Sequence, residues 1–187
     1  MAGRTKEEKQ MTTKPKTIID CDKDPFCPKD WIVEEHKKGG KLEWNPKNIS
    51  LYLSENQKKD WIKGNELREE LKGKPVLNAN VLDYLLAHPE LIPEEWKGKY
   101  VFFWGTIYRD SDGSLNVRYL GWNGERWNWS FNWLDNVWYD VCPAAVSAGE
   151  LEGLDSLILR IEKIEQWIDQ WENYESGWSK YRKNGQK

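Results

Sequence analysis

Few side chains in this sequence have the types and spacing that catalysis or metal binding requires. The two histidines, His36 and His88, are too few for a histidine-dependent triad or a multi-histidine metal site. Cys21 and Cys27 could join His36 as three zinc ligands, but their spacing matches no standard zinc motif and no fourth ligand is evident. We therefore expect a structured loop at these positions, with neither a metal nor a cofactor.

Carboxylates are the remaining candidates for catalysis. A glycosidase needs two of them facing each other across a cleft. Most acid pairs of the sequence lie on expected solvent-facing helix surfaces, whereas Asp135 and Asp140 lie in a segment of unusual composition. No nucleotide-binding loop, nucleophile elbow or zinc-protease motif occurs. We expect no enzyme, and keep a weak hydrolase using Asp135 or Asp140 as a third alternative.

Composition and charge argue against several classes of protein. The net charge is −3 and the sequence pI is about 5.6, so the chain lacks the basic excess typical of nucleic-acid binding. No run of about 18 apolar residues occurs, and the first sixteen residues contain no apolar signal region. The three cysteines make a poor disulfide framework. We expect a cytoplasmic protein with reduced thiols and no membrane partner.

The most unusual stretch is 122–143, which reads W-N-G-E-R-W-N-W-S-F-N-W-L-D-N-V-W-Y-D-V-C-P. It holds five of the 13 tryptophans, and no Lys, Glu or Gln occurs from 126 to 149. The simplest interpretation is a twisted antiparallel sheet with a tryptophan core, which leaves the missing residue types unexplained. A second interpretation is a fixed carbohydrate- or peptide-binding module, in which indole rings stack on the ligand and Asn, Ser and Asp supply hydrogen bonds.

A third interpretation follows from a resemblance. The runs 73–109, 117–120 (V-R-Y-L) and 122–146 resemble a family of mostly uncharacterised bacterial proteins that look like the variable proteins of diversity-generating retroelements. In those systems an error-prone reverse transcriptase copies a template repeat and randomises its adenines, and the copy replaces the end of the target gene. The resemblance covers roughly residues 17 to 148. It implies a non-catalytic ligand-binding protein with a C-type-lectin-like fold.

The residue types of the segment can be compared with that mechanism. Randomising the two adenines of an AAC codon yields Asn, Ser, Phe, Asp, Val, Tyr and Cys among others, but never Trp, Lys, Glu, Gln or Met. Apart from the tryptophans and Leu134, every residue from 128 to 142 belongs to the reachable set. The implied ligand-contacting positions are Asn128, Ser130, Phe131, Asn132, Asp135, Asn136, Val137, Tyr139, Asp140, Val141 and Cys142.

The residues that need no adenine have the opposite role in this scheme. Trp, Leu, Pro and Ala codons can all be written without adenine, so these residues would form a fixed framework, much as rigid frames carry antibody loops. Buried rings are expected at Trp122, Trp127, Trp133 and Trp138. The expected ligand is a protein, and a carbohydrate is the alternative.

Periodicity and breaks predict the elements before the segment. Short strands are expected at 31–35 and 41–44, joined by a turn at Gly39-Gly40, and another at 49–53. Helices are expected at 65–72, capped by Asn65, and over V-L-D-Y-L-L-A-H, capped by Asn78 or Asn80. These helices form the helical middle of the chain.

A sheet is expected next. Y-V-F-F-W-G-T-I-Y (100–108) reads as a buried strand, and S-L-N-V-R-Y-L-G-W (114–122) as its antiparallel partner. Asn123-Gly124 is a strong hairpin signal, so 126–133 should return beside it. Alternation then places Trp127, Trp129 and Trp133 on one face and Asn128, Ser130 and Asn132 on the other.

The expected organisation is a disordered tail at 1–17, a single α+β domain at 18–148, an amphipathic helix at 149–178 and a frayed tail at 179–187. The Trp-rich antiparallel sheet belongs to the domain. The helix begins at a capping box from Ser147 to Glu150 and has an apolar seam at 3-4 spacing. Two arrangements of this helix are expected as alternatives: its apolar seam packs on the sheet of its own domain, or it joins two copies of the chain in a homo-oligomer. The seam consists of Leu154, Leu157, Ile161, Ile164, Ile168 and Trp171.

Overall fold

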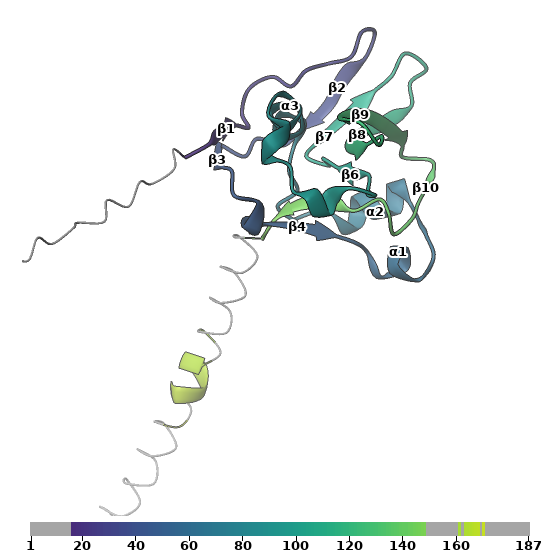
Figure 1. The fold of residues 1–187 in the computed structure, drawn as a ribbon. Coiled ribbons are helices and arrows are strands. Elements are labelled where there is room, and N and C mark those ends of the chain that lie inside the picture. Colours follow the sequence, from purple (N-terminus) through teal and green to yellow (C-terminus); the bar gives the residue numbers. More distant parts are fainter. Residues whose placement is uncertain (1–15, 149–160, 162, 169, 171–187) are drawn as a thin grey trace, which may run out of the picture.

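The computed structural model describes residues 16–148, 161, 163–168 and 170 (Figure 1). The expected N-terminal tail, most of the C-terminal helix with Leu154, Leu157 and Trp171, and the frayed end lie outside the described residues. Within the described part, helices combine with a curled mixed sheet, so the fold is α+β as expected.

The longest strand, β8 (Leu115–Trp122), lies at the centre of the sheet. One of its edges pairs with β9 (Trp127–Trp133) along the whole length of that strand. Its other edge pairs first with β7 (Thr106–Arg109) and then with β6 (Val101–Phe102). Strand β9 has no second neighbour among the described strands and is therefore an edge strand.

Two branches extend the sheet beyond β8. Strand β7 pairs with β2 (Ile32–His36), and β6 lies parallel to β11 (Ala144–Ser147), which in turn pairs with β4 (Ile49–Tyr52). A separate small sheet is formed by β1 (Ile18–Asp20) and β3 (Lys41–Glu43). The predicted strands around Gly39-Gly40 exist, but β2 and β3 pair with β7 and β1 rather than with each other.

Three α-helices connect these strands: α1 (Glu55–Lys59), α2 (Gly64–Glu70) and α3 (Ala79–Ala87). As predicted, the Asn78 side chain caps α3 by accepting a hydrogen bond from the backbone N–H of Asn80. The cap of α2 is Lys63 rather than the predicted Asn65. Single 3₁₀ turns occur at Pro46–Asn48, Pro89–Leu91 and Glu94–Trp96. No helix among the described residues is long and apolar enough to cross a membrane.

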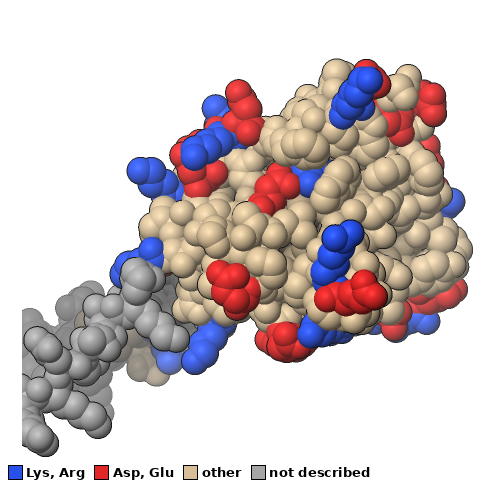
Figure 2. Space-filling view, turned by 45° about the horizontal axis from the view of Figure 1, so that its top comes forward, with Lys and Arg blue, Asp and Glu red and all other residues tan. Residues whose placement is uncertain are grey.

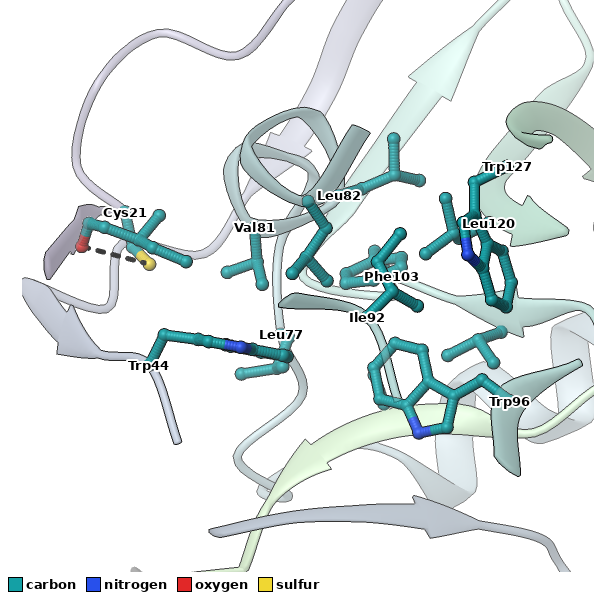
Figure 3. Close-up of a cluster of buried hydrophobic side chains, with 14 residues drawn as sticks. Cys21, Trp44, Leu77, Val81, Leu82, Ile92, Trp96, Phe103, Leu120 and Trp127 are labelled. Carbon is teal, nitrogen blue, oxygen red and sulfur yellow. Dashed lines mark hydrogen bonds between the residues drawn. The ribbon is translucent and has the colours of Figure 1, made fainter. Parts of the chain in front are cut away.

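The sheet separates two hydrophobic cores, because successive side chains of a strand point to opposite faces. On one face, Leu120 of β8 packs with the apolar side of α3 and with Trp127 (Figure 3). On the other face, Val117 of β8 packs with Leu67 and Leu71 of α2. Helices therefore cover both faces, and each core receives aromatic rings from the segment 122–143.

The predicted strand 100–108 is divided into β6 and β7 by a break at 103–105. A Cβ on Gly105 would lie 2.9 Å from three atoms of Asn78, so the start of α3 packs directly on the glycine backbone. The N–H of Gly105 accordingly donates to the carbonyl of Leu77 instead of to a neighbouring strand. Contact with α3 thus interrupts the ladder.

Candidate functional site

The hairpin of β8 and β9 arranges the first half of the Trp-rich segment as predicted. Its register runs from the pair Trp122–Trp127 to the pair Asn116–Trp133. The turn is fixed by the Asn123 side chain, which accepts hydrogen bonds from the N–H groups of Glu125 and Arg126. The odd-numbered side chains of β9 point towards the α3 face, and its even-numbered ones point to the opposite face.

The second half of the segment leaves the sheet and covers the core on the α2 face. Leu134 and Trp138 are buried at 1% and 0% exposure. Strand β10 (Val137–Trp138) pairs with β5 (Ile62–Lys63), which brings the segment against the start of α2. The approach is close: a Cβ on Gly64 would lie 2.5 Å from Nε1 of Trp138, so this position requires glycine.

Burial divides the eleven predicted contact positions into three groups. Five are exposed: Asp135, Asn136, Tyr139, Asp140 and Val141. Five are half-buried: Asn128, Ser130, Phe131, Asn132 and Val137. The last, Cys142, is buried in the core of the α2 face, and burial raises the pKa of its thiol. Its side chain therefore does not contribute to an exposed surface, contrary to the expectation.

The four tryptophan rings predicted to form the buried framework differ in how deeply they are buried. Trp127 and Trp138 are buried, as expected, and Trp122 is half-buried. The expectation for Trp133 is wrong, because this ring is 44% exposed. It lies at the end of an edge strand, and its indole N–H donates to the Asp110 carboxylate at 3.1 Å. A polar partner at the surface, rather than the core, holds this ring.

The odd-numbered face of β9 is partly covered by the segment 22–31. The ring of Phe26 packs edge-on against Trp129, with ring centroids 6.0 Å apart. Trp31 packs in the same way on Phe131 at 4.8 Å. Between 127 and 143 the exposed side chains are Trp133 and those of the loop 135–141 other than Val137 and Trp138, while the even-numbered side chains of β9 are half-buried.

Beneath this cover lies a charged side chain. The Arg118 guanidinium of β8 is 1% exposed and stacks over the rings of Trp129 at 4.2 Å and Phe26 at 5.0 Å. It donates two hydrogen bonds to the carboxylate of Asp83 in α3, at 2.7 and 3.2 Å. Ion pairing and cation–π contacts offset part of the cost of burying this charge, while Nε of Arg118 is buried without a hydrogen-bond partner.

A buried glutamine fixes the backbone of the exposed loop. Nε2 of Gln57 in α1 donates to the carbonyl oxygens of Tyr139 and Cys142, each at 3.0 Å. Oε1 of Gln57 accepts from the N–H of Ser54, and Oγ of Ser54 accepts from the N–H of Gln57. Sequence reasoning missed α1 and Gln57, although S-E-N-Q (54–57) is a capping-box signal.

The ring of His36, one of the candidate metal ligands, is bound by other groups of the chain. Both ring nitrogens of His36 have partners, Oγ1 of Thr106 at 2.9 Å and the carbonyl of Cys21 at 3.1 Å. Among the described residues no group of three or more His, Cys, Asp or Glu side chains could hold a metal ion. Two cavities of about 320 and 620 Å³ are lined largely by residues from 35–39 and 68–78, and no residue of 122–143 lines either one.

Charged side chains are mixed by sign on the face that Figure 2 shows. Lys and Arg lie beside Asp and Glu in small groups, with broad uncharged areas between them. This face therefore carries no separate basic area of the kind that nucleic-acid binding uses.

The fold and the site define an α+β domain with helices on both faces of a curled sheet and an exposed, fixed loop in a Trp-rich segment. Comparisons of the chain with protein-family models, with curated proteins and with solved structures found no match.

Proposed function

We propose that the chain is a non-catalytic ligand-binding protein whose surface at 128–141 is diversified, as in the variable proteins of diversity-generating retroelements. The proposal includes the finer fold assignment, a C-type-lectin-like arrangement followed by an amphipathic helix. The ligand that fits best is another protein, because the loop exposes large side chains such as Tyr139 and Val141, 48% and 41% exposed, and lines neither of the two cavities described above.

One observation carries the proposal. Residues whose codons can lack adenine are mostly buried, whereas residues reachable from an AAC codon are mostly exposed or half-buried. Residues that can be encoded without adenine, such as Leu134, Trp138 and Ala144, are at most 1% exposed. Ten of the eleven positions reachable from AAC codons have exposed or half-buried side chains. Cys142, which is buried, departs from the rule on one side, and the exposed Trp133 and the half-buried Trp122 and Trp129 depart from it on the other. Variation of the reachable positions would therefore change the surface and spare the core.

The coding DNA tests this proposal directly. We expect a near-identical repeat close to a reverse-transcriptase gene, with adenines at the codons of the ten surface positions and none at the codons of Leu134 and Trp138. A repeat with adenines at the codons of buried framework residues, or a genome without such a repeat, would refute diversification. A fixed binding module would then be the remaining candidate.

Binding without turnover is the second part of the proposal. Neither Asp135 nor Asp140, the two candidates for a hydrolase, lines either of the two cavities described above, and Asp135 accepts a hydrogen bond from the Asn65 side chain at 2.8 Å. Hydrolysis of glycoside or ester substrates that disappeared in both Asp135→Asn and Asp140→Asn would contradict a purely binding role.

We also propose that the C-terminal helix joins two copies of the chain. Ile161, Ile164 and Ile168 have helical conformation and are 54%, 55% and 45% exposed, so these three residues of the seam are not covered by the described part of the domain. Their 3-4 spacing is that of a coiled-coil seam. Ile164→Lys should shift the sedimentation coefficient to that of a monomer, whereas Gln166→Lys, on the other side of the helix, should leave it unchanged. A monomeric wild-type chain at micromolar concentration would refute the proposal.

A further inference from the structure

Four large apolar side chains lie exposed around the end of the Trp-rich segment. Tyr139 and Val141 belong to the segment, whereas Trp61 and Tyr100 do not. Their exposures are 44% for Trp61, 47% for Tyr100, 48% for Tyr139 and 41% for Val141. We call these four residues the rim patch. Clustered exposed rings of this kind mark interaction sites more often than isolated ones do.

Backbone pairing brings the four side chains together. Trp138 and Ile62 form the last pair of β10 and β5, and both are buried, so alternation directs the adjacent residues Tyr139 and Trp61 outward. On the other side of the loop, the N–H of Tyr100 donates to the carbonyl of Val141 at 2.8 Å. The rim patch thus consists of two exposed side chains of the segment, Tyr139 and Val141, and two rings from outside the segment, Trp61 and Tyr100.

The Tyr100 ring and the backbone of Tyr139 are held in place by contacts with the domain. The Tyr100 ring packs on Tyr119, with centroids 5.0 Å apart, and Gln57 binds the carbonyl of Tyr139. Rings that are already fixed lose little conformational entropy when a ligand binds, which favours aromatic residues as contact points.

Two acidic side chains accompany the rings. Asp60 precedes Trp61, and Asp140 lies between Tyr139 and Val141. Both residues are exposed, and neither carboxylate forms a hydrogen bond or an ion pair with a described residue. A partner that placed a Lys or Arg beside an apolar side chain would match both the rings and the charges.

We infer that Asp60, Trp61 and Tyr100 are fixed contact residues that border the variable loop, and that their ligand is a protein surface presenting a Lys or Arg beside an apolar group. The inference rests on the proposed function, since it assigns contact residues that do not vary to the border of a loop whose sequence is diversified. Aromatic residues and a polar rim are the usual composition of such contacts.

The test is selection from a library of the full-length chain in which positions 135–137 and 139–141 are varied with codons of the AAC-derived set. The probe is purified lysozyme, a small basic protein. In the selected binders, Trp61→Ala and Tyr100→Ala should each raise the dissociation constant about tenfold or more. Asp60→Asn should raise it less, and its effect should fade as salt increases, because exposed charge pairs are screened.

Ile32→Ala is the control, since Ile32 is an exposed apolar residue of β2, 57% exposed, outside both the Trp-rich segment and the rim patch. It should change the dissociation constant less than twofold, and all variants should retain cooperative melting. Binders that tolerate both Trp61→Ala and Tyr100→Ala would overturn the inference and leave the proposed function intact. A library that yields no binder would overturn the proposed function itself.

Discussion

At the scale of the residue, the pair formed by Arg118 and Asp83 is unequally buried. The Arg118 side chain is 1% exposed, whereas that of Asp83 is 31% exposed and can be hydrated if its partner is lost. An unpaired charge costs most where water cannot reach it. The two halves of this ion pair should therefore respond differently to mutation.

Asp83→Asn should lower the free energy of unfolding by about 3 kcal/mol, because it leaves a buried guanidinium without a countercharge. Arg118→Met should cost less, since methionine can fill the space between Trp129 and Phe26 while Asp83 takes up water. The double variant should be about as stable as Arg118→Met alone. Urea unfolding measures all three, and a larger loss in Arg118→Met than in Asp83→Asn would contradict this account.

At the scale of the element, α1 is a short helix whose main role is to hold the loop 139–142. A helix of five residues contributes little by itself, but its Gln57 side chain makes hydrogen bonds to two carbonyls of the loop and one to Ser54. The loop is therefore exposed without being free to rearrange.

Gln57→Glu should separate the hydrogen bonds to the loop from the hydrogen bond to Ser54. It keeps the side-chain shape and the acceptor for Ser54 but replaces the donating amide with a carboxylate. Two buried carbonyl oxygens would lose their donor and face a negative charge, which should cost about 2 kcal/mol or more. Hydrogen exchange of residues 139–142 should accelerate more than that of α3. Unchanged exchange in the loop would show that Gln57 does not hold it. Glu55→Gln, on the exposed side of α1, is the control.

The elements also show what the sequence can and cannot predict. Alternation and the Asn123-Gly124 signal are local, so the β8–β9 hairpin and its two faces were predictable. The break at Gly105 was not, because it depends on α3 packing against the glycine backbone. Trp133 and Trp138 are the same residue type five positions apart, yet one is 44% exposed and the other fully buried. Only the pairing of β10 with β5, a contact between distant segments, decides between them.

At the scale of the whole molecule, protonated groups buried in both cores link stability to pH. Burial raises the pKa of the Cys21 thiol from 9.0 to about 11 and that of the Tyr108 hydroxyl from 10.0 to about 12. For Tyr108, the nearby Arg118 opposes this shift without cancelling it. The Cys142 thiol is shifted in the same direction, also chiefly by burial. In the unfolded chain these groups ionise near their ordinary pKa values, well before they ionise in the fold.

The stability contributed by these groups is therefore fully present below about pH 9 and is lost as pH rises from 9 to 12, because the unfolded state releases its protons first. A shift of two pKa units corresponds to at most about 3 kcal/mol for each group. Urea unfolding under reducing conditions should show a decreasing free energy between pH 9 and 11. Cys21→Ala should flatten that decrease, since alanine does not titrate, even if it lowers stability at pH 7. A free energy that stays constant from pH 8 to 11 would show that these thiols and the phenol are hydrated in the fold.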